Sequence, residues 1–104
     1  MRKSFFDYIM TAKKITIFNS YVKLADYLNV PAQRLTDWKL QRGRVEPAEC
    51  VLLAILLGLD PAEIAFTIKA EREINPEKVT QWLNLAEQYA RPVNPPDKYK
   101  KHNK

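Results

Sequence analysis

The length and composition of the chain predict one small domain with a single core. It has 104 residues, 46% of them hydrophobic, which is enough to fold and too many for a disordered chain. The single cysteine, Cys50, excludes a disulfide framework or a cysteine metal site within one chain and favours a reducing compartment. The longest apolar run, CVLLAILLGL, is about half of a membrane span. We therefore expect a soluble cytoplasmic protein.

The net charge of +5 is distributed unevenly. Residues 1–45 carry nine Lys or Arg and three Asp, residues 46–90 carry three Lys or Arg and eight Asp or Glu, and residues 91–104 carry five and one. Basic surfaces attract polyanions, so nucleic acid is a candidate partner, although lysines that only solvate the surface would give the same composition. The acidic middle of the chain makes a protein a second candidate partner.

Caps and apolar spacing predict the first three helices. Ser4 begins a first helix, and Ser20 caps a second helix that reaches Leu28. Asn29 tolerates the left-handed conformation and turns the chain without a glycine. Pro31 then opens a third helix, where its missing N–H costs nothing.

The second half of the chain predicts three more helices and a tail. Pro47 starts a fourth helix, which is apolar on every side over residues 51–57 and is the expected buried centre. Asp60 caps a fifth helix and Asn75 a sixth. Residues 92–104 lack periodicity and predict a disordered basic tail, whose lysines either follow a DNA backbone or only solubilise the chain. The expected fold class is all-α, a bundle of five to six helices.

The stretch from Leu24 to Trp38 is typical of two short helices that cross steeply. Ala25 is small enough to let them approach closely. On the third helix, a rotation of about 100° per residue directs Gln33 and Asp37 away from the core. Thr36 lies beside them and Arg34 lies on the flank. An exposed helix with polar outer residues fits the major groove of DNA.

This stretch carries a resemblance to a known family. The matching positions are Leu24, Ala25, Leu28, Val30, Gln33, Leu35 and Trp38, followed by a basic segment with Gly43. The pattern resembles the helix-turn-helix regulators of the Cro and lambda-repressor (XRE) type. With LLGLDPAE at 56–63 and AERE at 70–73, it is also similar to small regulators of filamentous bacteriophages. It departs from the pattern at Asn29, at Pro31, and in a longer step from Trp38 to Gly43.

The resemblance implies a division of the chain and a set of contact residues. Residues 1–73 would form the DNA-binding domain, 74–91 a C-terminal helix and possible dimerisation element, and 92–104 the flexible tail. The residues expected to read bases are Gln33, Arg34, Thr36 and Asp37, of which Gln33 is best suited to pair with adenine. The residues expected to contact phosphates are Ser20, Tyr21, Lys23, Lys39, Arg42 and Arg44. Alternatively, Tyr21 packs on the first helix and Asp37 is only a surface acid.

The leading hypothesis is a sequence-specific transcriptional regulator, a phage or prophage repressor that binds operator DNA as a homodimer on the nucleoid of a bacterial host. One monomer offers few base contacts, so a dimer on a two-fold site is expected. The expected dimer surface is the stripe of Val79, Trp82, Leu83 and Tyr89, provided that the sixth helix is not packed within the monomer.

Two other functions stay open. One is a protein-interaction module, an antirepressor or a polymerase-binding protein that uses the acidic second half. The other is an architectural or excision factor that bends DNA. An enzyme, a cofactor and a metal site are not expected, because the only histidine, His102, lies in the tail and no nucleophile–base pair or metal-spaced cluster is visible.

Overall fold

The structure is a computed structural model that describes residues 4–101. Its helices are α1 (Phe5–Ile15), α2 (Tyr21–Leu28), α3 (Ala32–Lys39), α4 (Pro47–Leu57), α5 (Pro61–Arg72) and α6 (Pro76–Gln88), followed by a short 3-10 helix (Asp97–Tyr99). The predicted all-α class is confirmed, because the only β pairing within residues 4–101 is an isolated bridge between Thr16 and Lys100. No helix in this part of the chain combines the length and apolarity needed to cross a membrane.

The helix starts and ends coincide with the signals in the sequence. The Ser4 hydroxyl accepts a hydrogen bond from the N–H of Asp7, and the Asp7 carboxylate accepts one from the N–H of Ser4, which is a capping box. The Ser20 hydroxyl accepts a hydrogen bond from the N–H of Lys23. Asn29 has φ 60° and ψ 44°, the left-handed conformation that ends α2. Short polar side chains therefore determine where α1 and α2 begin and where the chain turns.

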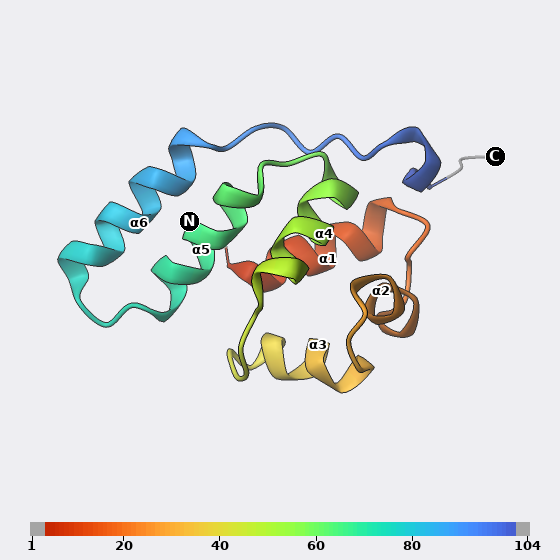
Figure 1. The fold of residues 1–104 in the computed structure, drawn as a ribbon, viewed down its shortest axis with the longest axis horizontal. Coiled ribbons are helices and arrows are strands. Elements are labelled where there is room, and N and C mark those ends of the chain that lie inside the picture. Colours follow the sequence, from red (N-terminus) through yellow and green to blue (C-terminus); the bar gives the residue numbers. More distant parts are fainter. Residues whose placement is uncertain (1–3, 102–104) are drawn as a thin grey trace.

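Helices α1 and α4 lie at the centre, with α2 and α3 on one side and α5 and α6 on the other (Figure 1). Leu53, Leu56 and Leu57 of α4 are fully buried. The expectation that α4 is buried on every side is wrong for Val51 and Ile55, which are 43% and 49% exposed. Helix α6 packs on α5 and not on α4, so one side of α4 has no covering helix within the described chain.

Helix α6 packs against α5 of the same chain. The Trp82 ring stacks on Phe66 with centroids 5.9 Å apart, and Tyr89 lies 6.0 Å from the same ring. Leu83 lines a small hollow shared with Thr67 of α5, and Val79 is half-buried. The predicted dimer surface required that the sixth helix is not packed within the monomer. Since α6 packs on α5, this requirement is not met.

The C-terminal segment contradicts the expected disordered tail over residues 92–101. The N–H of Asn94 donates to the Leu57 carbonyl at 2.8 Å, and the Tyr99 ring packs 5.6 Å from the rings of both Phe18 and Tyr27. Gly58 permits this path, since a Cβ there would lie 2.0 Å from the Asn94 carbonyl oxygen. The segment is held by backbone hydrogen bonds and one aromatic ring. Neither produces a periodic pattern of apolar residues, so the order of this segment could not be predicted from the sequence. His102 and Lys104 lie outside the described residues.

Candidate nucleic-acid interface

Helices α2 and α3 form a compact pair with a buried inner side. In Figure 1 α2 is seen along its axis while α3 lies lengthwise across the view, so the two cross steeply. Ala25 is 2% exposed at this crossing, and the N–H of Val30 donates to the Ala25 carbonyl at 3.0 Å. Of the residues expected on the inner side, Leu24, Leu28, Leu35 and Trp38 are buried, whereas Val30 is only half-buried. The packing expected from the sequence is confirmed, and it leaves the other side of α3 free of the core.

The outer side of α3 is polar and lies at one edge of the molecule (Figure 1). Gln33 and Thr36 are exposed, whereas Arg34 and Asp37 are half-buried. The Gln33 side-chain amide donates to Asp37 Oδ1 at 3.4 Å, and a guanidinium nitrogen of Arg42 lies 3.8 Å from the same oxygen. Asp37 is thus the centre of a small polar network. To pair with a base, the Gln33 amide must first break its weak hydrogen bond to Asp37.

The step from Trp38 to Gly43 is made mostly by a loop, because α3 ends before Gly43. Helix α3 ends at Lys39, and Gln41 takes a left-handed conformation with φ 58°. The N–H of Arg42 then donates to the Asp37 carbonyl at 2.8 Å. This turn places Arg42 back beside α3, near the predicted base-reading residues.

Two side chains outside the loop hold it in place. The Trp38 indole N–H donates to the Arg44 carbonyl at 3.3 Å, and the Arg72 guanidinium donates to the Gly43 carbonyl. Arg72 was missed by the sequence reasoning, because its position in the last turn of α5 gives no sign of its partner on a distant loop. The two exposed arginines at 42 and 44 are therefore carried on a loop that is tied to α3 and α5.

The residues expected to contact phosphates from α2 have partners within the protein. The Tyr21 ring packs edge-on against Phe6 with centroids 6.4 Å apart, and Lys13 Nζ lies 4.8 Å from the centre of the Tyr21 ring. The interpretation that Tyr21 packs on α1 is thus the one that the structure realises. Lys23 Nζ donates to the Asn19 side-chain oxygen at 3.2 Å, an exposed contact that solvent and phosphate can replace.

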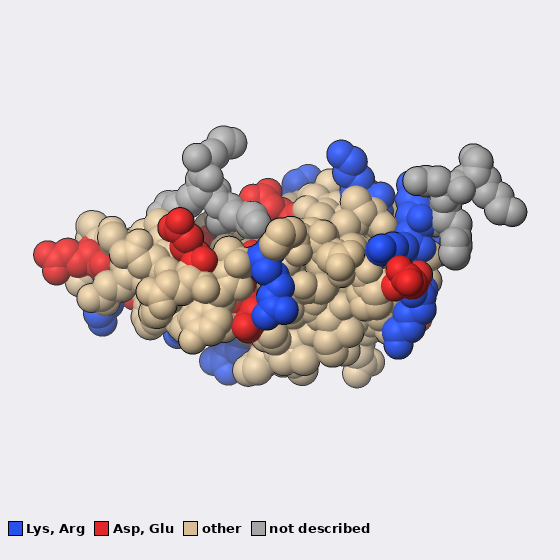
Figure 2. All heavy atoms as spheres, turned by 90° about the horizontal axis from the view of Figure 1, so that it is seen from above, with Lys and Arg blue, Asp and Glu red and all other residues tan. Residues whose placement is uncertain are grey.

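Charge is segregated in space as well as along the chain. Figure 2 shows the face that carries the C-terminal segment: basic side chains gather at the end where this segment finishes, and the opposite tip is mainly acidic. Near that tip, Glu73 accepts a hydrogen bond from the Trp82 indole at 3.0 Å. This bond is the main reason why the pKa of Glu73 is lowered. Glu73 at this end therefore takes part in the packing of α6 against the end of α5.

A buried polar network joins α1 to α5. The Tyr8 hydroxyl donates to Glu63 Oε2 at 2.7 Å and lies 3.1 Å from the Thr67 hydroxyl oxygen. Burial raises the pKa of Tyr8 well above its usual range. Glu63 also accepts a hydrogen bond from the N–H of Arg91, so it anchors the start of the C-terminal segment. The sequence indicated only that Glu63 lies in the first turn of a helix, and this network was missed.

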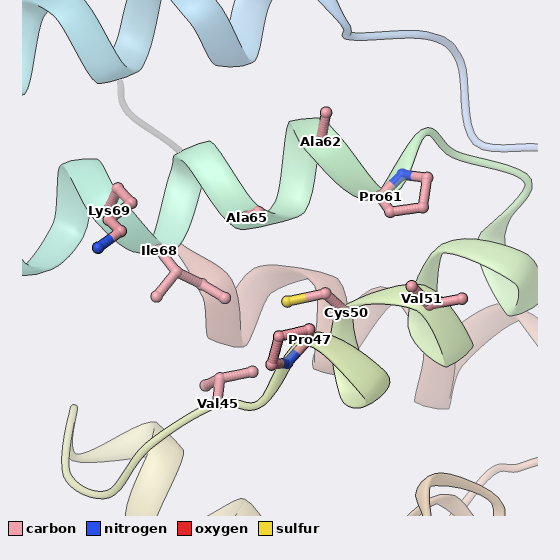
Figure 3. A pocket seen from close by; sticks show the side chains of 9 residues that line it. All are labelled: Val45, Pro47, Cys50, Val51, Pro61, Ala62, Ala65, Ile68 and Lys69. Carbon is pink, nitrogen blue, oxygen red and sulfur yellow. The ribbon is translucent and has the colours of Figure 1, made fainter.

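An apolar groove runs between α4 and α5 (Figure 3). Val51 and Cys50 line one side, Ala65 and Ile68 line the other, and the volume is about 340 Å³. Burial, with a smaller contribution from Glu49, raises the pKa of Cys50 to about 11, so its thiol stays protonated at neutral pH. Within residues 4–101 no three His, Cys, Asp or Glu side chains are placed to hold a metal ion.

Comparisons with known proteins add nothing to this geometry. No family model matches the chain, and neither a curated protein nor a solved structure is found to be similar to it. The resemblance to helix-turn-helix regulators therefore stays an expectation from the sequence, and the function has to be argued from the site.

Proposed function

We propose that the chain is a sequence-specific DNA-binding regulator of the helix-turn-helix type, with α3 as the recognition helix. The observation that carries the proposal is the two-sided character of α3. Leu35 and Trp38 are buried in the core, while Gln33 and Thr36 face solvent at an edge of the molecule. A helix whose inner side is buried in the core and whose outer side is polar and exposed has the shape and chemistry to enter the major groove.

The contacts follow from side-chain chemistry. Gln33 pairs through its amide with adenine, and the Thr36 methyl group contacts a thymine methyl. Arg34 and Asp37 complete the base-reading side, where Asp37 accepts from cytosine. Lys39, Arg42 and Arg44 neutralise phosphates, as do Ser20 and Lys23 at the start of α2. In this arrangement the phosphate contacts determine the register, and α3 reads the sequence.

The regulator acts as a repressor of phage or prophage type, in which a bound dimer blocks polymerase. A two-fold operator requires two copies of α3 about one helical turn apart. Because α6 packs on α5, the dimer either uses the outward side of α6 or a different surface. The oligomeric state therefore needs to be measured together with DNA binding.

A selection from random duplex DNA at physiological salt, with the same protein on a sizing column, tests the proposal. We expect enrichment of a two-fold symmetric sequence and elution as a dimer. Binding that is sensitive to salt but indifferent to sequence would contradict the proposed function. If the same duplexes were also bent on binding, an architectural factor would explain the result instead.

Removal of one phosphate contact gives a second test. Arg42→Ala should weaken binding to every sequence and make the dependence of log K on log salt shallower by about one. Lys78→Ala is the control, because it removes an exposed positive charge from α6, on the acidic side of the molecule. An unchanged salt slope for Arg42→Ala would remove this residue from the interface.

The alternative function is a protein-interaction module, and the groove of Figure 3 favours it. The groove is apolar and has Val51, 43% exposed, on its rim. In addition, Asp37 puts a negative charge on the face assigned to DNA. Val51→Glu should abolish a protein partner's binding and leave DNA binding intact, whereas Gln33→Ala should relax the DNA preference at one base position and leave the partner's binding intact. Titration of purified host RNA polymerase against both variants separates the two functions.

A further inference from the structure

The C-terminal segment returns to the beginning of the chain and is anchored there. The N–H of Ile17 donates to the Tyr99 carbonyl at 3.0 Å, and the N–H of Lys101 donates to the Ile15 carbonyl at 3.2 Å. Between these bonds the Tyr99 ring packs against Phe18 and Tyr27. Figure 1 shows this end of the chain beside the end of α1 and above α2. The last described residues are therefore positioned by the Tyr99 ring and by backbone hydrogen bonds at Tyr99 and Lys101.

This anchoring brings together lysines from the two ends of the sequence. Lys13, Lys14 and Lys101 line one shallow, open hollow at the end of α1. Asp7 is the single acidic residue among the residues that line it, and its carboxylate caps the N-terminus of α1. The hollow thus carries a net positive charge, and Figure 2 shows basic side chains gathered at this end of the molecule.

The hollow adjoins the start of α2. Asn19 belongs to its lining and also accepts the hydrogen bond from Lys23 Nζ. Ser20, the next residue, caps α2 and belongs to the set expected to contact phosphates. The lysines of the hollow therefore lie beside the start of α2, where Lys23 and the Ser20 cap are found.

We propose that this lysine cluster, completed by the folded-back C-terminal segment, binds the phosphate backbone of the same DNA duplex that α3 reads. The inference rests on the proposed function and adds a contact outside the helix-turn-helix. The lysines are long, solvent-accessible and spread over an open hollow, which suits a polymer that presents several phosphates together. Duplex DNA carries one charge per about 1.7 Å of its axis. The anchor at Tyr99 distinguishes this arrangement from a flexible basic arm.

Salt titrations of the full chain on the selected duplex test the cluster. Lys14→Ala and Lys101→Ala should each make the salt slope shallower by about one, and their double variant by about two. Lys78→Ala on α6 should leave it unchanged. Tyr99→Ala keeps every charge but removes the anchor, so it should lose the Lys101 contribution, whereas Tyr99→Phe keeps the ring and should bind as the wild type does. Circular dichroism checks that each variant is folded.

The outcomes separate the inference from the proposed function. If Lys14→Ala and Lys101→Ala both showed the salt slope of the wild type, the inference would be wrong, and the proposed regulator function would not be affected. A shallower slope in Lys101→Ala, with Tyr99→Ala equal to Tyr99→Phe, would also overturn it, because the segment would then act as an unanchored arm. Wild-type protein that binds duplexes without sequence preference would overturn the proposed function alone, and salt titrations of the same variants on any bound duplex would still decide whether the cluster contacts phosphates.

Discussion

Helices α3 and α6 both lie at the periphery, yet they are attached in different ways. Helix α3 has eight residues and buries Leu35 and Trp38 completely or nearly so in the main core. Helix α6 has thirteen residues, but only Ala86 is buried, and it is attached by half-buried rings that pack on α5. The shorter helix, α3, is therefore anchored in the main core, whereas the longer helix, α6, is attached through half-buried rings that pack on α5. A helix that must present side chains to a rigid duplex needs the first kind of support.

The largest effect should come from removing the support of α3. Trp38→Ala deletes a buried ring that packs edge-on against Phe5, with centroids 5.2 Å apart, and also loses the hydrogen bond to the Arg44 carbonyl. We expect a loss of about 3–5 kcal/mol in the free energy of unfolding, as for other buried aromatic deletions. Urea denaturation followed by circular dichroism measures it. A loss of stability smaller than that caused by Trp82→Ala would mean that α6, and not α3, is the more firmly supported helix.

The sequence predicted the helices well because their signals are local. The side chains of Ser4, Ser20 and Asp60 accept hydrogen bonds from N–H groups two or three residues away, and Asn29 turns the chain by its own left-handed backbone, so caps and turns can be recognised within a few residues. The buried side of α3 also followed from helical spacing.

The features that the sequence did not predict depend on distant partners. The bond from Arg72 to the Gly43 carbonyl, the contact of Tyr8 with Glu63 and the anchoring of Tyr99 each join segments far apart in the chain. The exposure of α4 at Val51 and Ile55 was missed for a related reason: composition shows that a helix is apolar, but not which of its sides receives a neighbour.

The next largest effect concerns the outer side of α3. Gln33→Ala should lose roughly 1–3 kcal/mol of binding free energy at one base position and relax the preference there. Gln81→Ala is the matched control, because it removes the same exposed amide from α6. Binding to a panel of single-base variants of the selected site measures both. Equal weakening on every sequence would assign Gln33 to the backbone and not to a base.

Removal of the support of α6 should have a smaller and more local effect. Trp82→Ala loses the stacking on Phe66 and the hydrogen bond to Glu73, but its ring is only half-buried. We expect a loss of about 1–2 kcal/mol in stability. Amide hydrogen exchange should quicken in α6 and stay unchanged in α3. Faster exchange in both helices would mean that α6 is part of the main cooperative unit.

The smallest effect is a pH dependence confined to the attachment of α6. The Trp82 indole lowers the pKa of Glu73 in the folded state, so folding favours the ionised carboxylate. This contribution is fully present above the usual pKa of glutamate and is lost as the pH falls through the lowered folded pKa. Trp82→Phe keeps the ring and removes the indole N–H, so it should lose less stability than the wild type on acidification. Urea denaturation at neutral and acid pH measures the difference. Parallel losses in the two proteins would show that the indole–carboxylate bond does not couple α6 to pH, and that stacking alone attaches the helix.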